Sequence, residues 1–260
     1  MVTRYLRGLN DGETYWHIMG TGFLVNEEGY VITNAHVINT AQEVLRNSDS
    51  TNKPLQVVFV GAGYQHPIYN YKVRHGTRFS AAGIEVVDID QINDIALLKT
   101  RRADRIGFPS HGPDNMNEED LIRLRQASEL MFSPCRLSDI EPDEGTMVAI
   151  SGYPLQIPTM VSQVGIIASN SFEEKVNLGS NDNIYNVFIH NFVIDATLNP
   201  GNSGAPVYFQ DGGEIIGVVR AYQPSPISPY SSLSQNSGLV LVVPIKRAID
   251  LLRKHNISWY

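Results

Sequence analysis

The sequence predicts an all-β fold of two six-stranded antiparallel β-barrels, with a helical connector between them and a C-terminal helix. Two observations predict this double barrel. Short apolar and β-branched segments follow one another in two series of six, and turn-forming residues separate the members of each series. The regular alternation of strand and helix that a parallel sheet requires is absent. We therefore expect a single domain over residues 1–260, with barrels at about 14–100 and about 146–244.

The first series begins with an expected hairpin. Residues 16–25 are apolar and β-branched, and Gly20 and Gly22 interrupt them. Residues 26–29 (Asn-Glu-Glu-Gly) have the composition of a turn, and residues 30–33 resume as a strand. A short helix is expected at residues 39–46. The other strands of this series are expected at residues 55–60, 69–75, 83–89 and 93–98.

A connector at about 101–145 interrupts the strands. Within it, residues 117–131 begin with acidic side chains and carry apolar ones at near-helical spacing, which predicts an amphipathic helix. The polar residues 170–183 and the Pro/Ser-rich residues 223–237 are expected to be loops. Pro244 precedes a closing helix at about 245–255. The strands of the second series are expected at residues 146–151, 160–169, 186–195, 205–209, 214–222 and 238–243.

Composition excludes several classes of partner. A net charge of −7 with 42% hydrophobic residues fits a folded protein and argues against nucleic acid, which requires a basic face. No apolar run approaches the roughly 18 residues of a membrane span, so no membrane partner is expected. The histidines show no metal-ligand spacing, and we expect neither a metal nor another cofactor.

The single cysteine and the N-terminal residues indicate in which cellular compartment the protein is expected. Cys135 is the only cysteine, which excludes an internal disulfide, and we expect an inert, at least partly buried thiol there. The first ten residues lack the apolar core of a signal peptide. A cytoplasmic location is therefore expected if Met1 is the natural start and the sequence has not been trimmed.

A turn around Ser203 carries the strongest chemical signal. Residues 199–206 read Asn-Pro-Gly-Asn-Ser-Gly-Ala-Pro, and Pro200, Gly201 and Gly204 constrain the backbone on both sides of the serine. Such a turn presents a hydroxyl and lets the amides of Gly201 and Ser203 converge, which is the geometry of an oxyanion hole. An ordinary turn with a solvent-facing serine explains the same residues equally well.

Two upstream residues supply what a nucleophilic serine needs. His36 follows the strand expected at residues 30–33, and Asp94 opens the apolar strand that ends at residue 98. Alone, each is explained by an ordinary structural role. Together with Ser203 they match a nucleophile, a base and an acid that orients the base, at a cleft between the two barrels. The lipase-type elbow G-x-S-x-G fits poorly, because residue 205 is alanine.

Four motifs carry a family resemblance: Gly-Thr-Gly-Phe-Leu-Val at 20–25, Gly-Tyr-Val-Ile-Thr-Asn-Ala-His-Val at 29–37, Asn-Asp-Ile-Ala-Leu-Leu at 93–98 and the turn at 199–206. The sequence resembles the chymotrypsin-fold (trypsin-like) serine proteases over roughly residues 16–255. By motif it is most similar to the Deg/HtrA-type bacterial proteases. The resemblance implies a serine endopeptidase with Ser203 as nucleophile, His36 as general base and Asp94 orienting His36. It also implies that the amides of Gly201 and Ser203 form the oxyanion hole.

The resemblance also locates a substrate pocket. It implies a lining of Thr197, Leu198, Val219, Arg220 and Ala221. Residue 197 is not the aspartate of members that cleave after Lys or Arg, and residue 219 is not the histidine of glutamate-specific members. We expect a small or medium aliphatic residue before the scissile bond. Arg220 either reaches an acidic group of the substrate or faces solvent.

The sequence departs from the Deg/HtrA pattern at its end. Those proteases usually carry a peptide-binding PDZ module after the closing helix and assemble as trimers, whereas this sequence ends at Tyr260. The oligomeric state is therefore open, and a recruiting partner or an additional domain is expected to deliver the protein or peptide substrate. An alternative function is a catalytically silent or latent binding module on a protease fold, which a partner activates; the long segment at 223–237 motivates it.

Overall fold

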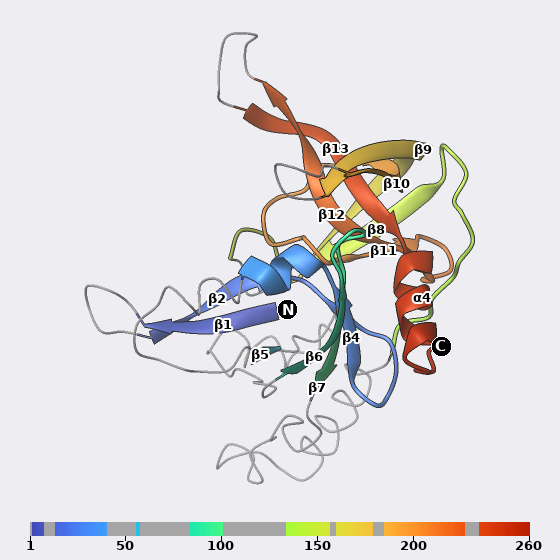
Figure 1. Ribbon diagram of the computed structural model, residues 1–260. Coiled ribbons are helices and arrows are strands. Elements are labelled where there is room, and N and C mark those ends of the chain that lie inside the picture. Colours follow the sequence, from blue (N-terminus) through green and yellow to red (C-terminus); the bar gives the residue numbers. More distant parts are fainter. Residues whose placement is uncertain are drawn as a thin grey trace, which may run out of the picture.

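The computed structural model describes residues 2–7, 14–40, 56–57, 84–100, 134–156, 160–178, 185–226 and 234–260. Among these residues strands dominate, which confirms the predicted all-β class (Figure 1). The strand expected at 69–75 and the amphipathic helix expected at 117–131 lie outside the described residues.

The N-terminal half contains two antiparallel sheets. Strands β1 (Val2–Arg7), β2 (Thr14–Gly20) and β5 (Gln56–Val57) form one sheet in the order β2-β1-β5. Strands β3 (Phe23–Leu24), β4 (Tyr30–Thr33), β6 (Ile84–Asp90) and β7 (Ile95–Thr100) form the other in the order β3-β4-β7-β6. The expected hairpin at the start of the series is confirmed, because Phe23 pairs with Ile32 across the turn.

The C-terminal half is a closed six-stranded barrel in the order β10-β13-β12-β11-β8-β9. Its strands are β8 (Met147–Gly152), β9 (Val161–Leu178), β10 (Tyr185–Asp195), β11 (Pro206–Phe209), β12 (Ile215–Pro226) and β13 (Ser234–Pro244). A short 3-10 helix, η2 (Pro154–Gln156), follows β8. The count of six strands predicted for this half is confirmed.

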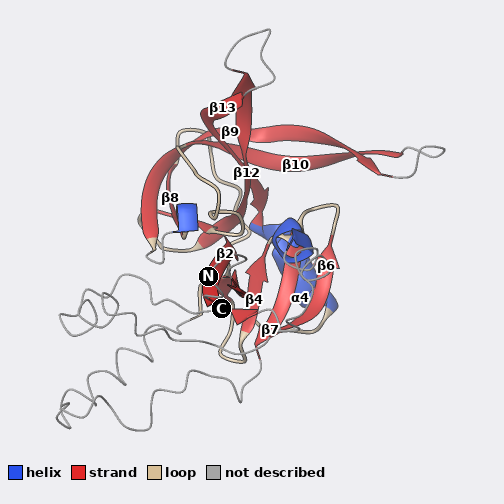
Figure 2. Cartoon of the chain, turned by 90° about the vertical axis from the view of Figure 1, so that its left-hand side faces the viewer, coloured by secondary structure: helices blue, strands red, loops and turns tan. Residues whose placement is uncertain are grey.

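The described residues of both segments that were expected to be loops are strand, so those two predictions are wrong there. Residues 170–178 extend β9, which pairs with β10 as far as Tyr185 opposite Leu178. This hairpin projects from the barrel (Figure 2). Residues 223–226 extend β12 and pair with the start of β13, as in Pro226 opposite Ser234. Strands that leave a barrel bury little of either face, so their composition is polar although their backbones are paired.

A helical segment at residues 35–40 follows β4 almost directly. The sequence predicted a helix at 39–46 and placed His36 at the end of a strand. The structure instead puts His36 in the first turn of a helix, so the placement in a strand is wrong. Residues 39 and 40 are helical as predicted, and residues 41–46 lie outside the described residues. Val37 and Ile38 of this helix are fully buried against Val31, Ala96 and Leu98, which explains the earlier start.

The closing helix α4 (Ile245–Lys254) confirms the helix predicted at about 245–255, and it joins the two halves. Its apolar side chains Ile245, Ala248, Ile249 and Leu252 are buried. They share one core with residues of the N-terminal sheet and the C-terminal barrel: Phe23, Ile32, Ile95, Leu97, Ile215, Val218 and Val243. Burial of apolar surface in this shared core, at roughly 25 cal/mol per Å², fixes one half against the other.

Cys135 lies at the edge of that shared core. It is partly buried, and burial raises the pKa of its thiol to about 11. The thiol therefore stays protonated near neutral pH, in line with the inert cysteine expected from the sequence.

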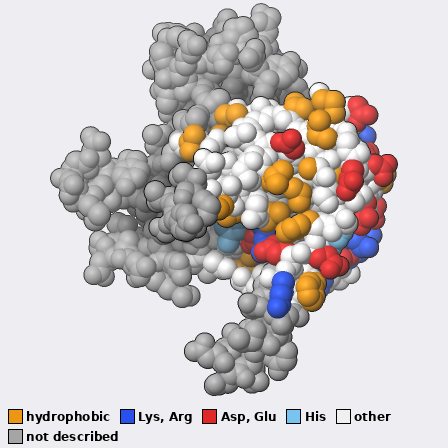
Figure 3. All heavy atoms as spheres, turned by 90° about the horizontal axis from the view of Figure 1, so that it is seen from above, with side chains coloured by type: hydrophobic (Ala, Val, Ile, Leu, Met, Phe, Trp, Pro, Cys, Tyr) orange, Lys and Arg blue, Asp and Glu red, His pale blue; other side chains and the backbone are white. Residues whose placement is uncertain are grey.

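The outer surface of the barrel carries several large apolar side chains. Figure 3 shows hydrophobic side chains in the middle of one face and acidic side chains mostly toward its edge. The exposed large hydrophobic residues of the barrel strands are Met147, Val164, Ile166, Phe188, Tyr222 and Leu239. Among the described residues no helix has both the length and the apolar character needed to cross a membrane.

Asp88 of β6 anchors the end of α4. Its Oδ2 lies 2.6 Å from His255 Nε2 and 2.7 Å from Lys254 Nζ. The hydrogen bonds from His255 and Lys254 lower the pKa of the Asp88 carboxyl from 3.8 to about 2. Because the folded-state pKa is the lower one, this stabilisation is complete above about pH 4 and is lost as the pH falls toward 2.

We predict that Asp88→Asn lowers the free energy of unfolding at pH 6 by about 0.5–1 kcal/mol, the range of partly exposed ion pairs. Denaturant titrations of the wild type and the variant between pH 6 and pH 2 measure the effect. The difference between the two proteins should shrink between pH 4 and pH 2. A difference that stays constant over this range would contradict the role assigned to the Asp88 carboxylate.

Candidate active site

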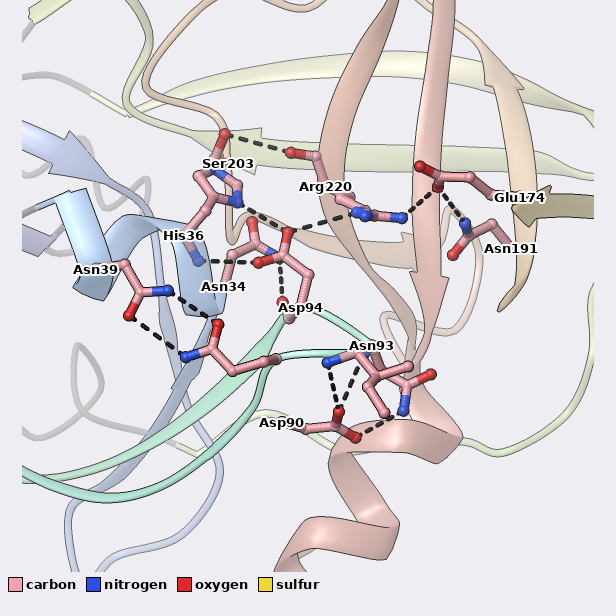
Figure 4. A network of polar contacts seen from close by, with 12 residues as sticks. Asn34, His36, Asn39, Asp90, Asn93, Asp94, Glu174, Asn191, Ser203 and Arg220 are labelled. Carbon is pink, nitrogen blue, oxygen red and sulfur yellow. Dashed lines mark hydrogen bonds and ion pairs between the residues drawn. The ribbon is translucent and has the colours of Figure 1, made fainter. Parts of the chain in front are cut away.

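His36 and Asp94 meet through two hydrogen bonds. His36 Nδ1 lies 2.8 Å from Asp94 Oδ2, and the His36 backbone N–H donates to Asp94 Oδ1 at 2.9 Å (Figure 4). The Asp94 side chain is 10% exposed and the His36 side chain 45% exposed. The carboxylate thus fixes the orientation of an imidazole whose other nitrogen, Nε2, remains available for chemistry.

The backbone around Asp94 is held in an uncommon conformation. Asp94 has φ of 56°, in the left-handed region that few residues other than Gly, Asn and Asp adopt. Its carbonyl oxygen accepts hydrogen bonds from the Ala35 N–H at 3.2 Å and from Asn34 Nδ2 at 3.0 Å. These bonds tie the turn before β7 to the start of the helix that carries His36.

Ser203 lies in the C-terminal barrel and shares a cavity with the other two residues. His36, Asp94 and Ser203 all line a cavity of about 670 Å³ formed by residues of both halves. The Ser203 hydroxyl donates to the carbonyl oxygen of Arg220 at 3.4 Å. No hydrogen bond joins Ser203 Oγ to His36 Nε2 within the described part of the chain. In ligand-free active sites such bonds are often long and shorten only when substrate binds.

The turn before Ser203 depends on glycine. Gly201 has φ of 102°, and a Cβ there would lie 2.3 Å from the Tyr153 carbonyl oxygen. The preceding carbonyl, that of Pro200, accepts a hydrogen bond from the Leu155 N–H at 2.7 Å. Because a trans peptide directs its N–H opposite its C=O, this bond turns the Gly201 N–H away from Leu155.

The residues predicted to line the substrate pocket are only partly brought together. Leu198, Val219, Arg220 and Ala221 line the cavity, whereas Thr197 is exposed and is not part of its wall as the structure describes it. The Leu198 carbonyl accepts a hydrogen bond from Asn236 Nδ2. This bond connects the cavity wall to β13.

The Arg220 guanidinium has neither of the two roles that the sequence left open. Its Nη1 pairs with Glu174 Oε2, and its Nε lies 3.6 Å from Asp94 Oδ2. Figure 4 shows the side chain directed toward these two carboxylates. Arg220 therefore borders the cavity, while its charge faces the Asp94 carboxylate.

Sequence reasoning missed Thr21, which ties the N-terminal half to the turn at Ser203. Its backbone N–H donates to the Ser203 carbonyl at 2.7 Å, and its Oγ1 donates to the Gly201 carbonyl at 2.9 Å. Oγ1 also accepts from the Tyr153 N–H at 3.1 Å. Thr21 is only 2% exposed. The Gly-Thr-Gly motif at residues 20–22 was the available signal, but nothing in the sequence pairs it with residue 201.

We predict that Thr21→Val lowers kcat by about 10–100-fold. The variant keeps the shape of the side chain but removes the hydroxyl that donates to the Gly201 carbonyl, and leaving this buried acceptor unpaired costs about 1–3 kcal/mol. Steady-state kinetics on a fluorogenic peptide measures the effect. Thr21→Ser, which keeps the hydroxyl, is the matched control and should stay within about threefold of wild type. Full activity in Thr21→Val with only a lower melting temperature would limit Thr21 to a stabilising role.

Comparison with known families agrees with this geometry. The profile of the trypsin-like peptidase domain matches residues 20–218. The chain belongs to this family. It therefore contains a trypsin-like peptidase domain. The matched residues include both sides of the cavity, from His36 to Ser203.

Named relatives of this trypsin-like peptidase domain are HtrA-type proteases. It is 27% identical over 233 residues to the probable periplasmic serine endoprotease DegP-like of Halomonas elongata, covering 90% of this chain and 34% of the relative. It is 24% identical over 226 residues to the mitochondrial serine protease HTRA2 of Drosophila erecta, covering 87% of this chain and 37% of the relative. The chain thus spans about a third of the length of these relatives.

Solved structures share the fold of the trypsin-like peptidase domain. The HtrA-type protease AlgW with decapeptide superposes with a TM-score of 0.54 at 18% identity, over 95% of this chain and 54% of AlgW. The active form of the Rv3671c protease from M. tuberculosis gives a TM-score of 0.53 at 17% identity, over 99% of this chain and 81% of that chain. At these levels of identity, the similarity shows a shared fold.

Proposed function

We propose that the chain cleaves peptide bonds of protein substrates through an acyl-enzyme intermediate, with Ser203 as nucleophile, His36 as general base and Asp94 as the residue that orients His36. One observation carries the proposal: His36 Nδ1 is held 2.8 Å from the Asp94 carboxylate in the cavity that Ser203 also lines. A carboxylate on Nδ1 fixes the tautomer that leaves Nε2 free to accept a proton.

In the proposed reaction the Ser203 oxygen attacks the scissile carbonyl carbon while His36 Nε2 takes the hydroxyl proton. The tetrahedral intermediate then collapses, the proton passes from His36 to the leaving amine, and the acyl group remains on Ser203. Water, deprotonated by the same imidazole, releases the acid product. The first step requires the Ser203 hydroxyl to turn from the Arg220 carbonyl toward His36.

The amides of Gly201 and Ser203 are the proposed oxyanion hole. The hydrogen bond from Leu155 to the Pro200 carbonyl supports this assignment, because it directs the Gly201 N–H away from that contact. The two hydrogen bonds from Thr21 to the Gly201 and Ser203 carbonyls support it too. Preorganised donors of this kind are each worth about 3–4 kcal/mol in the transition state.

The proposed substrate has a small or medium aliphatic residue before the scissile bond. Leu198, Val219 and Ala221 give the cavity an apolar wall. The carboxylates of Asp94 and Glu174 already engage the Arg220 guanidinium, so it is not free for an acidic side chain of a substrate. The relative AlgW was solved with a decapeptide, which is in keeping with a peptide as the bound molecule.

Active-site labelling tests the proposed function. A fluorophosphonate probe should modify the folded protein at one residue, and peptide mapping by mass spectrometry should identify it as Ser203. Heat-denatured protein is the control and should not react. Labelling that maps elsewhere, or a folded protein that resists the probe even with peptide present, would contradict the proposal.

A peptide library tests the substrate preference separately. Matched peptides with Val, Glu or Lys before the scissile bond should give kcat/KM values at least about tenfold higher for Val, because the apolar wall leaves a charged side chain unpaired. Mass analysis of the products identifies the cleaved bond. Faster cleavage after Glu or Lys would overturn the preference while leaving the catalytic assignment intact.

A further inference from the structure

The Arg220 side chain places a permanent positive charge beside the His36–Asp94 pair. Its Nε lies 3.6 Å from Asp94 Oδ2, the same oxygen that contacts His36 Nδ1 at 2.8 Å. The side chain is 18% exposed, so solvent screens this charge only in part.

Glu174 is the second partner of this guanidinium. It lies in the part of β9 that continues into the projecting β9–β10 hairpin, and its Oε2 pairs with Arg220 Nη1. The same oxygen accepts a hydrogen bond from Asn191 Nδ2 at 3.1 Å. Asn191 is fully buried, and its Oδ1 has no partner within the described residues. Within the described residues, the hydrogen bond to Glu174 is the only one that the Asn191 side chain makes.

These contacts matter for a reaction that places a positive charge on His36. When the imidazole takes a proton, it becomes an imidazolium facing Asp94 Oδ2, and the Arg220 guanidinium faces the same oxygen. Two cations that face the same carboxylate repel each other. Glu174 supplies a second negative charge on the far side of the guanidinium, so two carboxylates balance two cations when the imidazolium forms (Figure 4).

We propose that Glu174 is a positioning residue of the reaction, which holds and neutralises the Arg220 guanidinium so that the charge of Asp94 remains available to His36. Glu174 is not among the residues that line the cavity, and it acts through Arg220. This inference rests on the proposed function. It predicts an asymmetry: loss of Glu174 leaves an unbalanced cation beside His36, whereas loss of Arg220 removes that cation.

Steady-state kinetics on a fluorogenic peptide tests the asymmetry. Glu174→Gln should lower kcat by about 10–100-fold with KM within about twofold, because the effect arises when the imidazolium forms. Arg220→Gln should lose at least about fivefold less kcat than Glu174→Gln does, because it removes the cation itself. The double variant Glu174→Gln/Arg220→Gln should recover at least about tenfold of the lost kcat, since no unbalanced cation remains. Glu173→Gln, the same change at the exposed neighbouring residue, is the matched control and should behave as wild type.

Several outcomes would overturn the inference. These are a Glu174→Gln variant as active as Glu173→Gln, an Arg220→Gln loss as large as that of Glu174→Gln, or a double variant no better than Glu174→Gln. If Glu174→Gln does not fold, Arg220→Gln decides alone, because a merely structural ion pair predicts a large loss there. A wild-type protein that resists the fluorophosphonate probe and cleaves no peptide would refute the proposed function, and this inference with it. Unchanged variants of an active wild type would refute only the role of Glu174.

Discussion

Ser203→Ala is expected to lower kcat by about a million-fold, to the background of any practical assay. Without Oγ no acyl-enzyme can form, and His36 has no hydroxyl from which to remove a proton. Only binding and oxyanion stabilisation would then remain to act on the substrate. The measurement is turnover of a fluorescent unfolded protein together with fluorophosphonate labelling, and both signals should disappear.

Ser171→Ala is the matched control for this variant. Ser171 is an exposed serine of β9, so the same deletion of a hydroxyl there should leave turnover and labelling unchanged. Both variants should melt within a few degrees of wild type, because the only hydrogen bond of the Ser203 hydroxyl to the described part of the chain is a long one to Arg220. Turnover that persists in Ser203→Ala would exclude Ser203 as the nucleophile.

Asp94→Asn is expected to lower kcat by about ten-thousand-fold, with a small effect on stability. Asparagine accommodates the left-handed φ of 56°, so the turn before β7 should persist. An amide offers one oxygen instead of two, and the His36 backbone N–H already uses one acceptor. The amide nitrogen then faces His36 Nδ1, which forces the imidazole to carry its proton on Nε2, where it cannot accept one from Ser203.

Measuring stability and kinetics on Asp94→Asn separates an effect on catalysis from an effect on folding. Asp94→Asn should keep its far-UV circular dichroism spectrum and most of its melting temperature, while kcat collapses and KM changes little. Labelling of Ser203 should slow in parallel with kcat. A variant that retains more than about a tenth of wild-type kcat would show that His36 does not depend on the Asp94 carboxylate for its orientation.

Much of the fold was predictable because its signals are local. Alternating apolar residues predicted β6, runs of apolar and β-branched residues predicted β4 and β7, and the spacing of apolar residues predicted α4 within one residue of its observed end. The predictions of loops at 170–183 and 223–237 were wrong for a physical reason. A strand is recognised by its buried face, and the extended parts of β9, β10, β12 and β13 leave the barrel, so backbone pairing continues where side-chain burial has ended.

In the candidate site, too, the sequence predicted the residues with local signals but not their distant contacts. The residue types and their order pointed to His36, Asp94 and Ser203, and the structure brings all three to one cavity. Thr21 could not be assigned a role, because its partner Gly201 is 180 residues away in the chain. Arg220 was expected at the substrate or in solvent, since nothing in its own segment reveals that Glu174 of another hairpin lies beside it.

The sequence by itself determined the local backbone conformation of the turn around Ser203 and the types of side chain available for catalysis. Glycine and proline around Ser203 set a turn that few other residues adopt, as the φ of 102° at Gly201 illustrates, and a single histidine, aspartate and serine stood in motifs of one family. Only the tertiary structure decided which distant groups meet: Thr21 with Gly201, and Glu174 and Asp94 on either side of Arg220. The reason is that torsional preferences belong to a residue and its neighbours, whereas hydrogen-bond and charge partners depend on how the closed barrel and the N-terminal sheets pack together.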